Sequence, residues 1–189
     1  MLLLILGGVG SGKSAYAAQW AQSLGREAIR LSCPAFPGEG SPPPRTEAEP
    51  GPTGFVWKEW TADETLDAVI TRINLESNLF RADRRVLVVD SLSGWLRAAL
   101  RRDRIAGARP GTPGDGDDTP LRRVVQAILA YQGKRIVVSE EPYAGLADDP
   151  WERRYAGELA EAVRRLAGES HAVYRLTAGF ASELKGRRV

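Results

Sequence analysis

A glycine-rich stretch near the start of the chain constrains the fold more than any other feature. It matches the pattern G-x-x-x-x-G-K-[S/T], follows an apolar run at 2–6 and precedes an amphipathic helical period that begins at Ala17. In that context, glycines let backbone N–H groups turn toward a phosphate, and the helix start adds partial positive charge. Lys13 would reach the β and γ phosphates of a nucleotide, and the Ser14 hydroxyl would bind Mg²⁺. The predicted nucleotide-binding loop consists of Gly7, Gly8, Val9, Gly10, Ser11, Gly12, Lys13 and Ser14.

The apolar patterns along the rest of the chain alternate between strands and helices. Buried strands are expected at 2–6, 27–31, 86–90, 135–139 and 172–176. Helices with one apolar face are expected at 17–24, 66–73, 92–100, 121–129 and 151–166. This alternation predicts an α/β fold with a mostly parallel sheet and helices on both faces. Together with the loop, it indicates a single P-loop nucleotide-binding domain over residues 1–189.

Proline and glycine mark the expected helix ends and two irregular segments. Segment 33–54 holds seven prolines and four glycines in 22 residues, so we expect no helix there, but either a flap over the site or disorder. Segment 107–118 is expected to be a flexible surface loop between two helices. The predicted N-terminal caps are Thr119 and Asp149, each followed by proline, and the predicted C-terminal caps are Gly25 and Gly168.

Composition excludes several classes of protein. The net charge of the 189-residue chain is +2, which is too balanced to indicate a nucleic-acid or anionic-membrane partner. One cysteine and one histidine exclude an internal disulfide framework and the usual zinc clusters. No apolar run reaches the roughly 18 residues that span a bilayer, and the opening apolar run lacks the basic residues of a signal peptide. We therefore expect a cytoplasmic location.

Acidic residues follow two of the expected strands. Asp90 ends an apolar run, where it would help to hold Mg²⁺ or would cap the next helix. Glu140 and Glu141 follow another strand, and ligands of open α/β sheets bind at the carboxyl ends of strands. The pair would serve as a base, a metal support or a substrate contact, or would form a solvated turn. These alternatives leave the proton acceptor undecided.

Other chemically reactive residues favour a structural interpretation. His171 precedes the last expected strand, which is typical of a surface or edge histidine. Cys33 has no histidine nearby in sequence and is interpreted as an incidental small residue. Paired arginines lie on the polar faces of the expected helices, and among them Arg153 is the candidate for contact with substrate.

The sequence resembles the family of adenosylcobinamide kinase/adenosylcobinamide-phosphate guanylyltransferase. The similar stretches are LLLILGGVGSGKSAYA at 2–17, SLSGWLRAAL at 91–100, RIVVSEEPYAGLADDPWERRYAGELAEAVRRLA at 135–167 and AVYRLTAGFASELKG at 172–186. The resemblance implies a P-loop fold of the RecA and kinase group, a homotrimer, and two reactions. In these, ATP or GTP phosphorylates adenosylcobinamide, and GMP is then transferred from GTP to that phosphate.

The resemblance also implies roles for particular residues. The loop at 7–14 would hold the triphosphate, and Asp90 would match the acid after the family's third strand. Glu141 would match the glutamate of the family's N-E-V-G turn, and Arg153 would match an arginine of the helix that follows it. The family's guanylylated histidine has no counterpart in the corresponding segment 40–54, which contains Arg45 but no histidine. This departure argues against the guanylyltransferase step, because the phosphoramidate needs an imidazole nitrogen.

The leading hypothesis is a nucleotide-dependent phosphotransferase of cobalamin biosynthesis that uses Mg²⁺ and either GTP or ATP. Its predicted catalytic residues are Lys13, Asp90 and Glu141, its metal-binding residues Ser14 and Asp90, and its substrate contacts Glu140 and Arg153. Two alternatives stay open. One is a degenerate nucleotide-binding paralogue with a regulatory or assembly role, and the other is a kinase with a different small-molecule acceptor.

Overall fold

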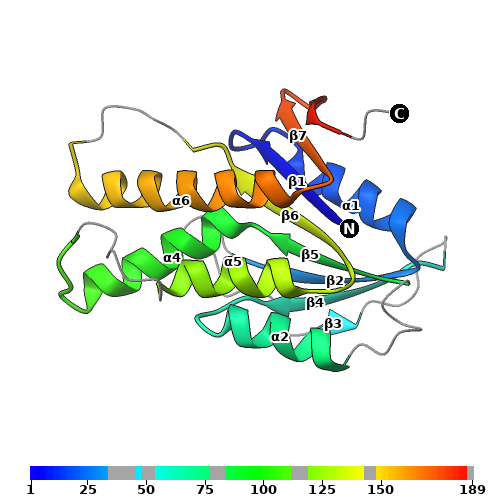
Figure 1. The fold of residues 1–189 in the computed structure, drawn as a ribbon, viewed down its shortest axis with the longest axis horizontal. Helices are drawn as coiled ribbons and strands as arrows, with labels where there is room; N and C mark the ends of the chain where they lie inside the picture. The colour runs from blue at the N-terminus through cyan, green and yellow to red at the C-terminus, as the bar shows by residue number, and fades with distance from the viewer. Residues whose placement is uncertain (34–45, 48–53, 77–83, 112–118, 143–147, 187–189) are drawn as a thin grey trace.

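The computed structural model describes residues 1–33, 46–47, 54–76, 84–111, 119–142 and 148–186 (Figure 1). The strands are β1 (Leu2–Gly7), β2 (Glu27–Ser32), β3 (Thr46–Glu47), β4 (Val56–Thr61), β5 (Arg85–Asp90), β6 (Lys134–Glu140), β7 (Ala172–Thr177) and β8 (Phe180–Lys185). The helices are α1 (Lys13–Leu24), α2 (Leu66–Glu76), α4 (Leu92–Ile105), α5 (Pro120–Ala130) and α6 (Pro150–Glu169). The predicted alternation of strands and helices is confirmed.

Within the described residues, eight strands form one sheet in the order β3-β4-β2-β5-β6-β1-β7-β8. The six strands from β4 to β7 are parallel, and the outermost strands β3 and β8 pair antiparallel to their neighbours. Parallel strands share one carboxyl edge, so the ends of β1, β5 and β6 lie next to one another. This edge positions the site described below.

Helices cover both faces of the sheet, as predicted. α1 packs Ala17 and Ala21 against β-branched residues of β5 and β6 on one face. The other face is covered by α2, α4, α5 and α6, and α6 packs against both α4 and α5. Because β1 is central and covered on both faces, all six of its residues are buried, which explains its unbroken apolar sequence.

The predicted N-terminal caps are confirmed, but one predicted C-terminal cap is wrong. The Thr119 and Asp149 side chains accept from the backbone N–H groups of Arg122 and Trp151 at 3.2 and 2.9 Å. Gly25 ends α1, and its N–H donates to the carbonyl of Ala21. Gly168, by contrast, lies inside α6, which continues to Glu169.

The end of α6 is closed by side chains instead of a left-handed glycine. Ser170 is the C-terminal cap, and its hydroxyl donates to the carbonyl of Leu166 at 2.7 Å. Lys185, reaching over from β8, donates to the carbonyls of Ala167 and Gly168 at 2.9 and 2.7 Å. These side chains donate to carbonyls at the end of α6 that would otherwise accept from backbone N–H groups of a terminating glycine motif.

The two irregular segments fall largely outside the described residues. From segment 33–54 the structure describes Cys33, the short strand β3 and Gly54, and from segment 107–118 it describes residues 107–111. The predicted flap and flexible loop therefore stay predictions. Among the described helices, none combines the length and apolar composition that crossing a bilayer requires.

Two glycines provide a test of the packing. A Cβ at Gly25 would lie 2.6 Å from the carbonyl oxygen of Arg84, which the N–H groups of Arg26 and Glu27 hold in place. We expect Gly25→Ala to lower the free energy of unfolding by about 1–3 kcal/mol. Gly157→Ala, in α6 where the added Cβ would meet open space, should raise it by up to ~1 kcal/mol. Urea denaturation measures both, and equal effects of the two substitutions would contradict this account of Gly25.

Candidate functional site

The glycine-rich loop connects β1 to α1 at the carboxyl edge of the sheet. Gly7 requires glycine, because its φ is 154° and a Cβ would lie 2.5 Å from the Leu176 oxygen on β7. Gly12 has φ 89°, in the left-handed region, and immediately precedes Lys13, the first residue of α1. The Gly179 N–H, in the turn between β7 and β8, donates to the Ser11 carbonyl at 3.2 Å. The β7–β8 turn therefore supports the loop from outside.

Lys13 folds back over this loop. Its Nζ donates to the Gly8 carbonyl at 2.5 Å and lies 3.5 Å from the Ser11 hydroxyl. Burial lowers the pKa of Lys13 from its usual value, while the carboxylates of Glu140 and Asp90 act in the opposite direction. The loop thus carries a cation placed among backbone groups, with two carboxylates close enough to influence it.

Asp90 contacts the first turn of α1 across the sheet edge. It ends β5, and its Oδ1 accepts a hydrogen bond from the Ser14 hydroxyl at 3.1 Å. The alternative role as a helix cap is wrong, because Ser91 caps α4 by accepting from the Gly94 N–H at 3.1 Å. The structure therefore brings the Ser14 hydroxyl and the Asp90 carboxylate together, as their predicted shared role requires.

Glu140 lies between the loop strand and the Asp90 strand, because β6 separates β1 from β5. Its Oε2 accepts from the Tyr155 hydroxyl at 3.2 Å and lies 3.7 Å from an Arg97 nitrogen. Burial, followed by the charge of Glu140, raises the pKa of Tyr155, so this hydroxyl stays protonated and able to donate. Arg97 also stacks on the Tyr155 ring, with its guanidinium carbon 4.0 Å from the ring centroid.

Sequence reasoning missed Arg97 and Tyr155. Tyr155 falls in the apolar stripe of α6, and Arg97 lies on α4 within a helix rich in arginine. The one signal in the sequence is a tyrosine near the start of a helix that packs against a strand, where that strand ends in an acidic residue. Knowing the partner strand, however, requires the tertiary arrangement.

The other predicted substrate and catalytic residues lie apart from these contacts. Glu141 forms an ion pair with Arg175 of β7 at 3.0 Å, and its backbone N–H donates to the Gly7 carbonyl at 3.4 Å. Arg153 donates to the carbonyl of Asp148, just before α6, at 3.2 Å. Their predicted roles in catalysis and substrate binding stay predictions.

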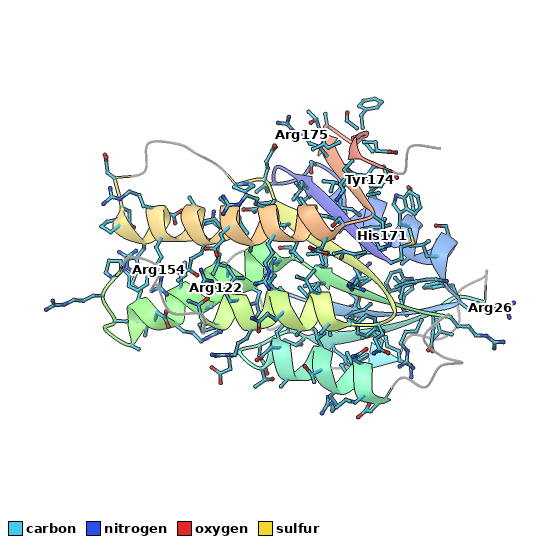
Figure 2. All side chains as sticks on the ribbon, viewed as in Figure 1. Arg26, Arg122, Arg154, His171, Tyr174 and Arg175 are labelled. Atoms are coloured by element: carbon cyan, nitrogen blue, oxygen red, sulfur yellow. The ribbon has the colours of Figure 1, made fainter. Side chains whose placement is uncertain are left out.

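His171 is exposed at the surface, which confirms the first of the two predicted placements, surface or edge. It precedes β7, and its Nδ1 accepts from the N–H of Leu2, the first residue of β1, at 3.2 Å. The loop begins at Gly7, the last residue of the same strand β1. His171 therefore lies at the opposite edge of the sheet from the loop, whereas Arg175 lies farther along β7 (Figure 2).

Cys33 is buried at the end of β2. Burial, and to a smaller extent the charge of Asp90, raises the pKa of its thiol, so the nucleophilic thiolate is scarce at neutral pH. We expect the folded protein to react with dithionitrobenzoate at least about tenfold more slowly than the unfolded protein in guanidinium. The unfolded chain should release one equivalent, from its single cysteine. Rapid labelling without unfolding would contradict the buried placement.

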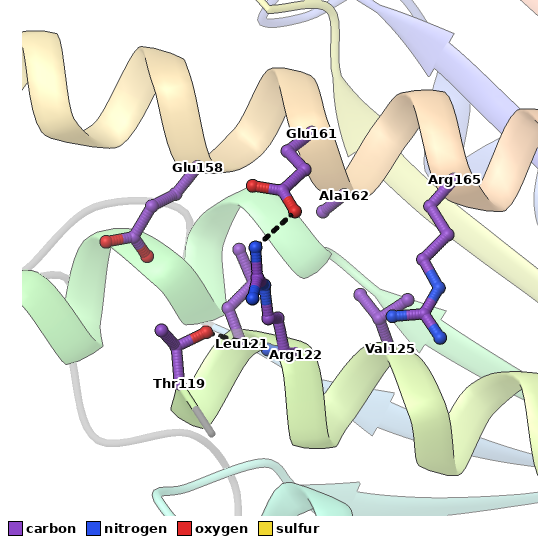
Figure 3. A pocket seen from close by; sticks show the side chains of 8 residues that line it. All are labelled: Thr119, Leu121, Arg122, Val125, Glu158, Glu161, Ala162 and Arg165. Carbon is purple, nitrogen blue, oxygen red and sulfur yellow. Dashed lines mark hydrogen bonds and ion pairs between the residues drawn. The ribbon is translucent and has the colours of Figure 1, made fainter. Parts of the chain in front are cut away.

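A small hollow between α5 and α6 lies away from the loop. Its volume is about 20 Å³, space for one water molecule, and Arg122 and Glu161 form an ion pair across it at 2.8 Å (Figure 3). A third charged side chain of the lining, Glu158, pairs with Arg154 at 2.7 Å. We assign the hollow a packing role.

Comparisons with known proteins bear on the fold. No family model matches the sequence, and no curated protein sequence is similar to it. Among solved structures, the chain is similar to a prototypical ATPase from the type III secretion system of pathogenic bacteria, with a TM-score of 0.52 and 14% sequence identity. The match covers 93% of this chain but 51% of the other, so the chain spans about half the length of that ATPase. At this identity the likeness concerns the fold, a mostly parallel α/β sheet with flanking helices.

Proposed function

We propose that this protein is a nucleotide-dependent phosphotransferase that binds a nucleoside triphosphate with Mg²⁺ at the loop. The observation that carries the proposal is the hydrogen bond of 3.1 Å between Ser14 and Asp90, directly beside Lys13. It joins the end of the glycine-rich loop to the end of β5. A hydroxyl and an ammonium at the start of α1, together with a carboxylate at the end of β5, form the set that phosphoryl transfer uses.

The residues present fit a magnesium nucleotide. Hard oxygen ligands suit Mg²⁺, and the Ser14 hydroxyl and the Asp90 carboxylate offer them at one place. When bound, Mg²⁺ would neutralise charge on the β and γ phosphates. Lys13 would exchange its contact with the Gly8 carbonyl for a phosphate oxygen, and the backbone N–H groups of the loop would bind the remaining phosphate oxygens.

Glu140 is the carboxylate best placed to receive the acceptor's proton. Asp90 is assigned to the metal through Ser14, and Glu141 is paired with Arg175 at the β7 side of the loop. Glu140 has partners as well, through its Oε2, but it is the carboxylate with the larger effect on the pKa of Lys13, and it adjoins the groove through Arg97 and Tyr155. In the proposed step, a hydroxyl oxygen of the acceptor forms a bond to the γ phosphorus while the bond to the bridging oxygen breaks. The nucleoside diphosphate leaves, and the hydroxyl proton passes to the carboxylate.

Sequence resemblance supports adenosylcobinamide as the acceptor and phosphorylation as its reaction. The position of His171 supports omission of the guanylyl step, because the chain's single histidine lies at the opposite sheet edge from the loop. A different small-molecule acceptor is the second candidate, which is favoured by the arginine-lined groove beside Glu140. The proposed location is the cytoplasm.

GTP labelled separately on its α and γ phosphates tests these assignments. The protein is incubated with it, Mg²⁺ and cobinamide, with Lys13→Ala as the control. Transfer of the γ label alone to cobinamide supports the proposal. Transfer of the α label would contradict the omission of the guanylyl step. If neither label moves, with ATP also tried, while nucleotide still binds tightly, the protein is a nucleotide binder instead of a cobinamide kinase.

A further inference from the structure

A groove lies between α4 and the start of α6, next to Glu140. Its volume is about 530 Å³, within the range of small-molecule sites. One wall is the α4 face that carries Arg97, Arg101 and Arg104, and the other carries the aromatic rings of Trp151 and Tyr155. The groove therefore combines cationic side chains with flat apolar surface.

The charges of the groove are only partly neutralised. Arg97 is 3.4 Å from Glu152, and Arg104 is 3.2 Å from Asp149. Arg101 has no ion-pair partner among the residues that the structure describes. Since Arg97 and Arg104 each have a carboxylate partner, the uncompensated positive charge of the groove comes from Arg101. It would favour an anion over a neutral or cationic ligand.

The inner end of the groove meets the candidate site. Arg97 and Tyr155 line the groove and also contact Glu140. The Nε of Arg97 is buried at this junction and has no hydrogen-bond partner in the described part of the chain. A ligand seated between the arginines and the aromatic rings would place one end against Glu140.

We propose that this groove binds the acceptor of the transferred phosphoryl group and that the acceptor is an amphipathic anion. This ligand class favours the second candidate, a different small-molecule acceptor, over adenosylcobinamide, which carries no anionic group. Its anionic group would contact Arg101 and Arg104, and its apolar or aromatic part would pack on Trp151 and the exposed Ile105. The acceptor role rests on the proposed phosphotransferase function, whereas the ligand class rests on the groove alone.

The probe is 8-anilinonaphthalene-1-sulfonate, a fluorescent aromatic anion, titrated into the full-length protein. Its uncharged counterpart N-phenyl-1-naphthylamine has the same rings without the sulfonate. We expect Arg101→Glu to weaken binding of the sulfonate about tenfold and Arg101→Gln to weaken it less, because charge reversal adds repulsion. Arg164→Glu, an equal charge change at an exposed site on α6, should leave it unchanged. Wild-type protein should bind the uncharged compound about tenfold more weakly than the sulfonate.

A parallel titration with a fluorescent nucleotide and Mg²⁺ separates the two proposals. Arg101→Glu should retain nucleotide affinity, and Lys13→Ala should lose it while still binding the sulfonate. Equal sulfonate affinity in wild type and Arg101→Glu would overturn the groove as an anion site. Absence of nucleotide binding by the wild type would instead overturn the phosphotransferase function and, with it, the acceptor role of the groove.

Discussion

Replacing Lys13 by alanine is expected to reduce the rate of γ-phosphoryl transfer by at least about a hundredfold. Lys13 supplies the ammonium that lies over the loop, and its Nζ is within 3.5 Å of the Gly8 carbonyl and the Ser11 hydroxyl. Negative charge that develops on the phosphoryl oxygens would lose its nearest fixed cation. The measurement is the initial rate of release or transfer of γ-labelled phosphate at saturating nucleotide.

The matched control is Lys185→Ala. Lys185 also donates to backbone carbonyls, but to those at the end of α6, and it pairs with Val173 near the start of β7. Its loss should destabilise the end of α6 slightly and leave the transfer rate within about twofold of the wild type. Equal losses of rate in the two variants would show that Lys13 acts through stability and would contradict its role in the transfer.

The central strands could be predicted from sequence because burial on both faces leaves a continuous apolar pattern. β1 and β5 lie inside the sheet and are covered by helices on each side, which explains the apolar runs at 2–6 and 86–89. The same argument located Asp90, since an acid is conspicuous where such a run ends. The loop motif then predicted that the first helix follows directly after the loop.

The outer strands could not be predicted, because they need no such pattern. β4 is half-exposed along its length and includes Lys58 and Glu59, of which Glu59 pairs with Arg30 of β2 at 3.0 Å. β8 is exposed at every residue. Ion pairs and positions near the edge of the sheet allow polar residues in these strands. Because the apolar periodicity is then lost, an analysis of the sequence pattern assigns these residues to loops.

The contacts of Glu140 also could not be predicted from the sequence. The strand pattern does not distinguish the two adjacent glutamates, and the family resemblance favours Glu141 as the catalytic one. In the structure they contact different partners: Glu140 contacts Arg97 and Tyr155, and Glu141 contacts Arg175. Which of them faces the groove depends on the insertion of β6 between β1 and β5 and on the packing of α4 against α6. Strand order is a tertiary property that local periodicity does not encode.

Substitution of Asp90 by asparagine should separate the charge of this residue from its hydrogen bond. Asparagine keeps an oxygen that can accept from the Ser14 hydroxyl, now 3.1 Å from Asp90, but it removes the negative charge. We expect the Mg²⁺ concentration for half-maximal transfer to rise by up to about a hundredfold. The free energy of unfolding should change by less than ~0.5 kcal/mol, because Asp90 is only partly buried and the hydrogen bond is retained.

A Mg²⁺ titration of the transfer rate measures this effect, and Asp103→Asn provides the matched control. Asp103 lies on α4, half-exposed, and pairs with Arg154 at 3.5 Å, away from the loop. Its loss removes the same charge from the protein without touching the Ser14 hydroxyl, so the Mg²⁺ requirement should stay that of the wild type. An unchanged Mg²⁺ requirement in the Asp90→Asn protein would mean that Asp90 serves only to orient Ser14. The proposed metal site would then have to be built from the Ser14 hydroxyl and the nucleotide phosphates alone.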